Sequence, residues 1–235
     1  MTNKLLFFVL LALCFSGCDM LETHPYDVHI TGERELNNKN IQLIENKMQG
    51  KKTIRFAMIS DTQRWYNSTE DVVKALNARG DIDFVIHGGD QSDFGVTKEF
   101  IWMRDIFNKF QMPYVCLLGN HDCLGTGEDA YRAIYGDPNF AFTAGNVRFI
   151  CLNTNAMEYD YSEPVPDFNF IENELNNLSP EIEKTVFAMH VTPFEFVFIN
   201  NVAKIFQLYV NQFPKVQFCL YGQDHNFAVD DLFND

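Results

Sequence analysis

Basic residues are scarce in this chain. It has 18 Lys and Arg residues against 32 Asp and Glu residues, a formal net charge of −14. A protein whose main partner is a nucleic acid needs a basic surface to neutralise phosphates. The composition therefore argues against nucleic acid as the main partner, and against a nuclease. It does not exclude a small phosphorylated substrate, because bound divalent metal ions can reverse the sign of the field inside a pocket.

The sequence also lacks internal repeats, low-complexity tracts and the cysteine spacing of a zinc knuckle. Hydrophobic residues make up 46% of the chain and aromatic residues 14%, which is typical of a globular protein rather than a disordered one. A chain of 235 residues is long enough for one domain with its own core. Oligomeric state is not predicted by any of these features.

The N-terminus has the pattern of a targeting segment. Lys4 precedes the apolar run Leu5 to Phe15, which is too short to span a membrane comfortably. The run ends in Phe15-Ser16-Gly17-Cys18, which resembles a bacterial lipobox. We expect residues 1–18 to be a lipoprotein signal peptide with lipid attached at Cys18. An ordinary cleaved signal peptide is the alternative.

Acyl chains on Cys18 would anchor the protein to the extracytoplasmic face of a bacterial membrane, in the periplasm or at the cell surface. Residues 19–37 are polar and acidic-leaning, and we predict that they form a tether. Residues 38–235 are then the folded domain.

Past the tether, apolar runs alternate with segments of helical period, which is typical of an α/β domain. The expected strands are Thr53 to Ile59, Ile82 to Ile86, Pro113 to Leu118, a hairpin of Phe140 to Thr143 with Val147 to Leu152, Thr185 to Met189, and Val216 to Tyr221. The expected helices are Glu70 to Arg79 with a capping box of Ser68 and Asp71, Thr97 to Phe110 capped by Thr97, Glu128 to Tyr135, Phe168 to Leu178, and Asn201 to Phe213.

Five of the expected strands are followed by residues of metal-ligand type. These are Asp61, Asp90, Asn120 with His121, His190 and His225. Each alone has a structural explanation, such as capping a turn or being a satisfied interior histidine. In open α/β sheets, however, the functional crevice lies outside the carboxyl ends of the strands. Five such residues at successive strand ends therefore predict one shared site.

The motifs around these residues carry a family resemblance. In order they are Ile59-Ser60-Asp61-Thr62-Gln63, Gly88-Gly89-Asp90-Gln91-Ser92-Asp93, Gly119-Asn120-His121-Asp122, Met189-His190-Val191-Thr192-Pro193 and Gly222-Gln223-Asp224-His225. From about Thr53 to Asn226 the chain resembles the calcineurin-like metallophosphoesterases. The resemblance implies a two-sheet sandwich flanked by helices (αββα). Its last strands would be missing, because the chain ends ten residues after His225.

The resemblance also implies a pair of divalent metal ions, which could be Mn, Fe, Zn or Mg. The implied ligands are Asp61 and His225 for the first ion, Asn120 and His190 for the second, and Asp90 for both. The implied catalytic residues are His121, which would protonate the leaving alkoxide, and Asp93, which would orient His121. Arg64 is a candidate for binding the substrate phosphate.

Two glutamines depart from the family pattern. Gln63 and Gln223 stand where the family has histidine ligands, one for each ion. A glutamine offers an amide oxygen at similar reach, so the site would be richer in oxygen and would favour harder ions such as Mn and Mg. The expected function is hydrolysis of a phosphomonoester or phosphodiester by a metal-bound hydroxide, with His121 as general acid. The alternative is a lipoprotein with weakened or lost turnover that keeps the fold as a binding or accessory module.

Several residues near the motifs have open interpretations. Trp65 and Tyr66 either line the substrate pocket or form a surface turn. His87 is interpreted as a strand-end residue rather than a ligand, and Asp122 as support for the site or as part of a turn. Phe194, Phe196 and Phe198 either form an apolar wall for substrate or take part in core or lipid-facing packing.

Overall fold

The structure is a computed structural model that describes residues 24–160, 162–198, 202–226 and 228–229. The predicted signal peptide, Cys18 and residues 19–23 of the predicted tether lie outside the described residues. No helix within the described ranges is both long enough and apolar enough to cross a membrane.

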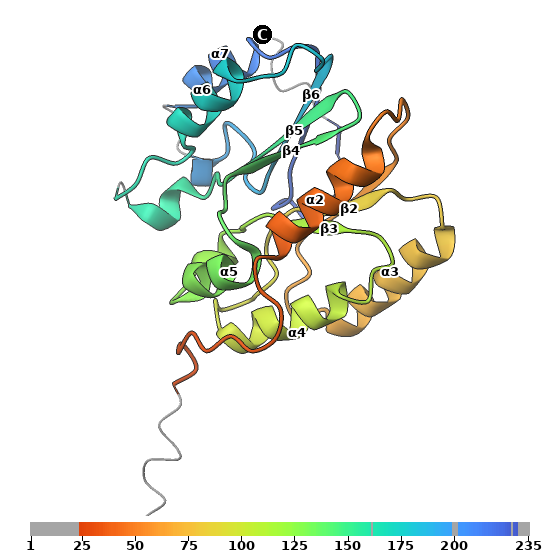
Figure 1. Ribbon diagram of the computed structural model, residues 1–235. Helices are drawn as coiled ribbons and strands as arrows, with labels where there is room; N and C mark the ends of the chain where they lie inside the picture. Colours follow the sequence, from red (N-terminus) through yellow and green to blue (C-terminus); the bar gives the residue numbers. More distant parts are fainter. Residues whose placement is uncertain (1–23, 161, 199–201, 227, 230–235) are drawn as a thin grey trace, which may run out of the picture.

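The described strands form two sheets (Figure 1). The first sheet is parallel and contains β1 (Phe56–Ile59), β2 (Phe84–His87) and β3 (Tyr114–Cys116) in that order. The second contains β4 (Phe140–Ala144), β5 (Val147–Leu152), β6 (Lys184–Met189) and β7 (Val216–Leu220) in that order. In this sheet β4 is antiparallel to β5, as predicted for the hairpin, and β5, β6 and β7 run parallel.

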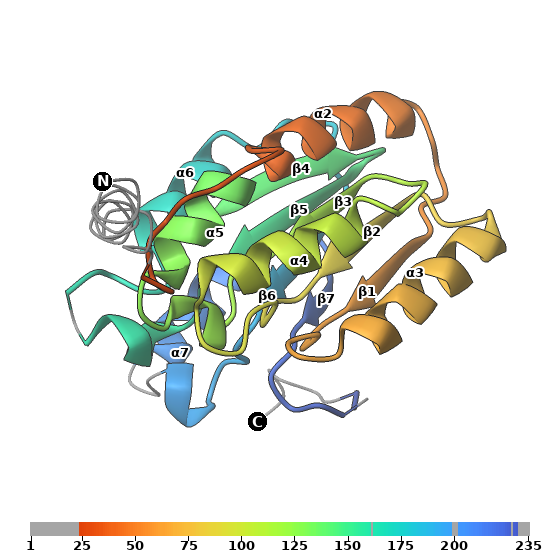
Figure 2. The ribbon, with the colours of Figure 1, turned by 90° about the horizontal axis from the view of Figure 1, so that it is seen from below.

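Helices cover the outer faces of both sheets (Figure 2). They are α3 (Tyr66–Arg79), α4 (Thr97–Phe107), α5 (Gly127–Tyr135), α6 (Phe168–Asn176) and α7 (Ala203–Val210), whereas α2 (Leu36–Met48) packs at the edge where β3 and β4 meet. Helices α3, α4 and α5 share one apolar core with the outward residues of the first sheet, and α6 and α7 share another with the second sheet. The predicted α/β fold with two packed sheets between helices is therefore confirmed.

Alternation along the strands explains the layers. In β2, Val85 packs toward the helices while Phe84 and Ile86 pack toward the second sheet. The inner core is strongly aromatic: Phe142 and Phe149 stack with ring centroids 4.9 Å apart, and Phe84 meets Phe149 edge-on. This rigid interior fixes the strand ends that carry the predicted ligands.

The N-terminal part of the domain differs from the prediction. Helix α2 was not predicted, yet its Ile44 and Met48 are fully buried in the core between the sheets. The described part of the predicted tether also lies against the domain. The side chain of Thr97 donates to the carbonyl oxygen of Asp27, and the Arg104 guanidinium donates to Thr31 and Glu33 carbonyl oxygens. Packing on the domain therefore begins well before residue 38.

Helix starts also differ from the expected ones. Helix α3 begins at Tyr66 rather than Glu70, so Ser68 and Asp71 lie inside it and form no capping box. Helix α4 has Val96 as its N-cap rather than Thr97, and the backbone N–H groups of Phe94 and Val96, just before the helix, donate to the Glu99 carboxylate. The Thr97 hydroxyl contacts the N-terminal segment instead, a long-range contact that the local sequence pattern does not contain.

Candidate metal centre

The predicted site residues gather at the carboxyl ends of β1, β2, β3, β6 and β7. Each strand stops in a sharp turn, and several of the predicted ligands have left-handed backbone conformations: φ is 56° at Asp61, 60° at Asp90, 70° at Gln223 and 49° at His225. Such conformations are uncommon for residues other than glycine and concentrate at functional sites.

Glycines let these turns approach one another closely. A Cβ atom on Gly119 would lie 2.1 Å from Asp90 Oδ1 and 2.2 Å from the Asp90 nitrogen. A Cβ atom on Gly222 would lie 2.2 Å from Ser60 Oγ. Both distances are far inside van der Waals contact, so the loops after β2 and β3, and those after β1 and β7, need glycine at these positions.

One group of ligand atoms is buried. Single ligand atoms of Asp61, Asp90 and His190 all lie within 4.8 Å of one another. His190 Nε2 is 3.4 Å from Asp90 Oδ1 and 3.0 Å from Asn120 Oδ1. The other ring nitrogen of His190, Nδ1, donates to the Gly88 carbonyl oxygen at 2.8 Å, so Nε2 is the nitrogen directed at the two ligand oxygens.

The electrostatics of this group follow from its burial. Burial by itself lowers the pKa of His190, but the hydrogen bond and charge of Asp90 outweigh it and raise that pKa to about 9. Burial by itself raises the pKa of Asp90, but the hydrogen bond and charge of His190 lower it. A cation bound between them would take the place of the shared proton.

A second group lies around Asp61 and is more open. His225 Nε2 is 3.3 Å from Asp61 Oδ1, and the Gln223 backbone nitrogen donates to Asp61 Oδ2 at 3.2 Å. The Gln63 side-chain nitrogen lies 3.4 Å from Asp90 Oδ2. Gln63 thus approaches Asp90 through its side chain, and Gln223 approaches Asp61 through its backbone.

Three oxygens in this second group accept no hydrogen bond in the described part of the chain: Gln63 Oε1, Gln223 Oε1 and Asp61 Oδ1, the last of which lies 3.3 Å from His225 Nε2 without hydrogen-bond geometry. All three are buried, and a buried polar atom without a partner costs about 1–3 kcal/mol. A hard divalent cation accepts carboxylate and amide oxygens as ligands and would satisfy them together. The residues present therefore fit a metal ion.

His121 lies beside the ligand groups rather than among them. Its backbone N–H donates to Asp90 Oδ1 at 3.0 Å. Its ring Nδ1 is 2.9 Å from the carbonyl oxygen of Asp93, whereas the Asp93 carboxylate is 3.8 Å away. The nearer contact to the ring thus comes from the Asp93 backbone. The Asp93 carboxylate pairs with the guanidinium of Arg64, whose side chain is 60% exposed.

The Asp122 side chain links the loop after β2 with the loop after β3, which carry Asp90 and Asn120. Its side chain is fully buried and accepts five hydrogen bonds, from the backbone N–H groups of Asp90, Gln91, Ser92 and Gly119 and from the Ser92 hydroxyl. Burial and the charge of Asp90 raise the pKa of Asp122 to about 7. The position directly after His121 was the only sequence signal for this role.

Two other polar residues lie at the same edge. His87 Nδ1 accepts from the Gly89 nitrogen and its Nε2 contacts Thr62 Oγ1, and burial lowers its pKa to about 3. It is a strand-end residue, as interpreted from the sequence. The Asn155 side chain donates to the Leu118 carbonyl oxygen. No motif marked Asn155, so sequence reasoning missed it.

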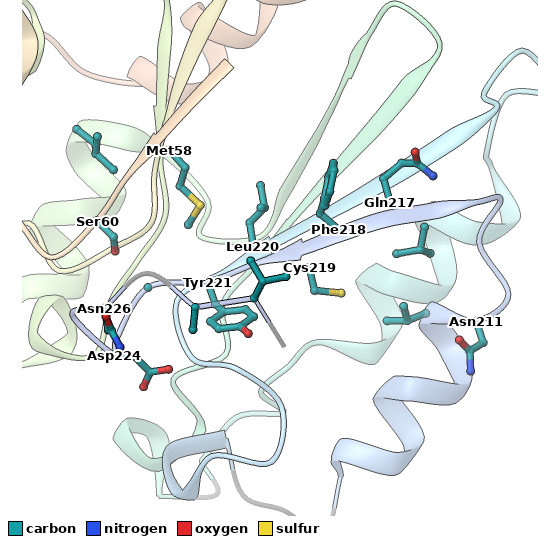
Figure 3. A pocket seen from close by; sticks show the side chains of 16 residues that line it. Met58, Ser60, Asn211, Gln217, Phe218, Cys219, Leu220, Tyr221, Asp224 and Asn226 are labelled. Atoms are coloured by element: carbon teal, nitrogen blue, oxygen red, sulfur yellow. The ribbon is translucent and has the colours of Figure 1, made fainter. Parts of the chain in front are cut away.

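A cavity of about 980 Å³ opens beside the centre, between β1 and β7 (Figure 3). Its lining includes Met58, Ser60, Phe218, Leu220, Asp224 and Asn226. Ser60 and Asp224 are next in the chain to Asp61 and Gln223, so the cavity adjoins the open group of ligands. Its described lining does not include Asp90 or His190.

The chain belongs to the calcineurin-like phosphoesterase family, whose model matches residues 54–227. A 3′,5′-cyclic-nucleotide phosphodiesterase of Nostoc sp. is 24% identical over 163 residues, which is 66% of this chain and 60% of that protein. The chain thus spans less than two thirds of that relative. A purple acid phosphatase from yellow lupin (Lupinus luteus) seeds matches with a TM-score of 0.46 and 17% identity, over 60% of this chain and 31% of the other.

Proposed function

We propose that this protein is a metal-dependent phosphoesterase that hydrolyses a phosphomonoester or a phosphodiester at a centre for two divalent ions. The main support is the convergence of Asp61, Asp90 and His190, each on its own family motif, to within 4.8 Å. The similarity to a cyclic-nucleotide phosphodiesterase supports the same reaction class.

The ligands divide into two sets. Asp61, Gln63 and His225 would hold one ion, Asn120, His190 and Gln223 the other, and Asp90 would be shared, because a carboxylate has two oxygens to offer. The unpartnered amide oxygens of both glutamines favour hard ions such as Mn and Mg over Zn. Bound ions of this kind would stabilise charge on the phosphate oxygens and favour deprotonation of a water molecule.

His121 would supply the proton for the leaving oxygen. Its Nδ1–H donates to the Asp93 carbonyl oxygen, because a carbonyl can only accept. This contact sets the ring orientation and leaves Nε2 to carry and release the proton. The side chain is 37% exposed, so a substrate can reach it. Arg64, on the far side of Asp93, is suited to attract the substrate phosphate.

The test is hydrolysis by the purified full-length protein. We expect release of an aryl alcohol from an aryl phosphate or a bis-aryl phosphodiester with added Mn or Mg, and none after chelation. His121→Asn should retain metal and lose turnover. If the folded, metal-loaded protein hydrolyses neither substrate, the phosphoesterase proposal is wrong.

The two glutamines support one competing proposal, a binding or accessory module that has lost turnover. Elemental analysis separates the two. About two ions per chain together with hydrolysis would exclude the accessory module, whereas a folded chain without ions or turnover would favour it.

We also propose that the protein is anchored to a membrane outside the cytoplasm through acyl chains on Cys18. The Phe15-Ser16-Gly17-Cys18 pattern supports this. Mass spectrometry of the N-terminal peptide should show an acylated Cys18, and Cys18→Ser should release the protein from membranes. An N-terminus without acyl groups would contradict the anchor.

A further inference from the structure

Large apolar side chains are exposed around one side of the metal centre. Trp65 is 62% exposed, Phe94 58% and Leu124 38%, and each stands four residues after a proposed ligand, Asp61, Asp90 and Asn120 respectively. Tyr26 and Val28, in the N-terminal segment, are each 39% exposed. We call these five residues the apolar rim.

The segments that carry the apolar rim touch one another. Arg64, next to Trp65, pairs with Asp93, next to Phe94. Gly95 lies against Leu124 so closely that a Cβ atom on it would be 1.8 Å from the Leu124 carbonyl oxygen. The three loops that carry Trp65, Phe94 and Leu124 therefore adjoin one another.

The N-terminal segment joins the same surface. The Thr126 hydroxyl donates to the Tyr26 carbonyl oxygen, and the Thr97 hydroxyl donates to that of Asp27. A Cβ atom on Gly125 would lie 2.5 Å from the Tyr26 ring. Figure 2 shows the first described residues beside the loop that leads into α5. The described chain thus starts beside the loop that carries Leu124 of the apolar rim.

The position of this start indicates what covers the apolar rim. Cys18 precedes His24 by six residues, which span at most about 20 Å when extended. Acyl chains on Cys18 would therefore keep His24, two residues before Tyr26 of the apolar rim, within about 20 Å of a bilayer surface. We propose that the apolar rim docks on the membrane that holds the anchor, so that the metal centre faces the lipid headgroups. This inference rests on the anchor given under the proposed function.

The chemistry of the apolar rim suits the interface of a bilayer. Tryptophan and tyrosine have an apolar body and a polar atom, and they concentrate at the level of the headgroups. Charges near the apolar rim have both signs: Arg64 pairs with Asp93, and the Glu99 carboxylate accepts from the Phe94 N–H. Because there is no basic excess, docking should depend on apolar contact and not on anionic lipid.

Tryptophan fluorescence can test this docking. The chain has two tryptophans, Trp65 and Trp102, so replacing both with Phe gives a background without the fluorophore. Phe94→Trp in that background places a probe on the apolar rim. Phe218→Trp is the matched control, because Phe218 is also 58% exposed but lies on β7. The full-length anchored protein is placed in phosphatidylcholine vesicles whose acyl chains are brominated.

We expect the bromine atoms to quench the probe at position 94 at least twofold and to leave the probe at position 218 unchanged. The effect should persist at high salt and should not increase when anionic lipid is added to the vesicles. Equal quenching at both positions, or none at position 94, would overturn the proposal. A blue shift at position 94 that grows with protein concentration without vesicles would instead identify a second copy of the chain as the occupant.

The outcomes are independent of the phosphoesterase assay, which uses soluble aryl phosphates. Quenching without hydrolysis would contradict the proposed activity and leave the docking surface standing. Hydrolysis without quenching would do the reverse. Circular dichroism of each variant, compared with the unsubstituted protein, shows whether a missing signal comes from misfolding.

Discussion

The two halves of the candidate metal centre are built differently. Around Asp90 the side chains are buried and held: Asp90 is 2% exposed, His190 and Asp122 are fully buried, and each makes hydrogen bonds across loops. Around Asp61 the site opens to solvent and to the cavity, with the His225 side chain 65% exposed and three buried oxygens unpartnered. Both halves come from the same family motifs.

The difference shows how a scaffold can organise ligands to different degrees. The loops after β2 and β3 are fastened to each other by the Asp122 carboxylate, so the ligands Asp90 and Asn120 are positioned before any metal arrives. Within the described residues the loop after β7 is held by fewer such contacts: the Gly222 N–H donates to the His190 carbonyl oxygen, and the Gln223 N–H donates to Asp61 Oδ2. We therefore expect the half around Asp90 to bind its ion more tightly than the half around Asp61.

Removing the shared carboxylate charge should break both halves. Asp90→Asn removes the negative charge between His190 and the group around Asp61. Loss of a residue that only supports a metal ligand typically lowers activity by about 10–100-fold, so we expect the loss of this shared ligand to lower hydrolysis by more than about 100-fold. Hydrolysis of an aryl phosphate and metal content per chain measure the effect. Unchanged metal content would show that Asp90 holds no ion.

Asp122→Asn should loosen the buried half alone. The amide NH2 group of asparagine would face backbone N–H groups that now donate to a carboxylate oxygen, and two donors cannot form a hydrogen bond with each other. Each buried donor left without a partner costs about 1–3 kcal/mol of folding free energy. We expect lower stability in urea and a 10–100-fold weaker metal affinity. Asp71→Asn, on the exposed surface of α3, is the matched control and should change neither quantity.

Gln223→His should strengthen binding of the ion that Asn120, His190 and Gln223 would hold. An imidazole in place of the amide adds a nitrogen ligand, so we expect Zn affinity to rise by roughly tenfold, which is about 1.4 kcal/mol, with little change for Mg. Competition titration with a coloured zinc chelator measures it. Equal affinities before and after the substitution would mean that position 223 does not face an ion.

His87→Gln should weaken the pH dependence of stability. Burial lowers the pKa of His87 from 6.5 to about 3, so between these pH values the unfolded chain binds a proton that the folded chain does not. Stability is therefore lost as the pH falls below 6.5, with a limiting slope of about 1.4 kcal/mol per pH unit. Urea unfolding at pH 7 and pH 5 should show a smaller loss in the variant; an identical loss would contradict the assignment.

Much of the fold could be predicted from local patterns. The strands appear in the sequence as short segments that are apolar throughout or that alternate apolar and polar residues. The hairpin turn appears as Ala144-Gly145-Asn146, in which Gly145 has a φ of 59°. Helix α2 was missed because its apolar residues, such as Ile44 and Met48, are few and separated by polar ones. Only the core between the sheets makes that segment a buried helix.

The site could be predicted as a set of residues but not as a set of contacts. Asp61, Asp90, Asn120, His190 and His225 were identified from motifs at strand ends, and the structure brings them together. The pairing of Asp93 with Arg64, and of the His121 ring with the Asp93 carbonyl, joins loops that a motif cannot relate. The same holds for the five hydrogen bonds that Asp122 accepts.

By itself, the sequence determined the family, the order of the strands that carry ligands and the chemical types of those ligands, because these depend on residue identity and local spacing. Only the tertiary structure decided which half of the centre is buried, which oxygens lack partners and where the N-terminal segment meets the site. Those properties depend on contacts between residues tens of positions apart, and packing, not local preference, selects them.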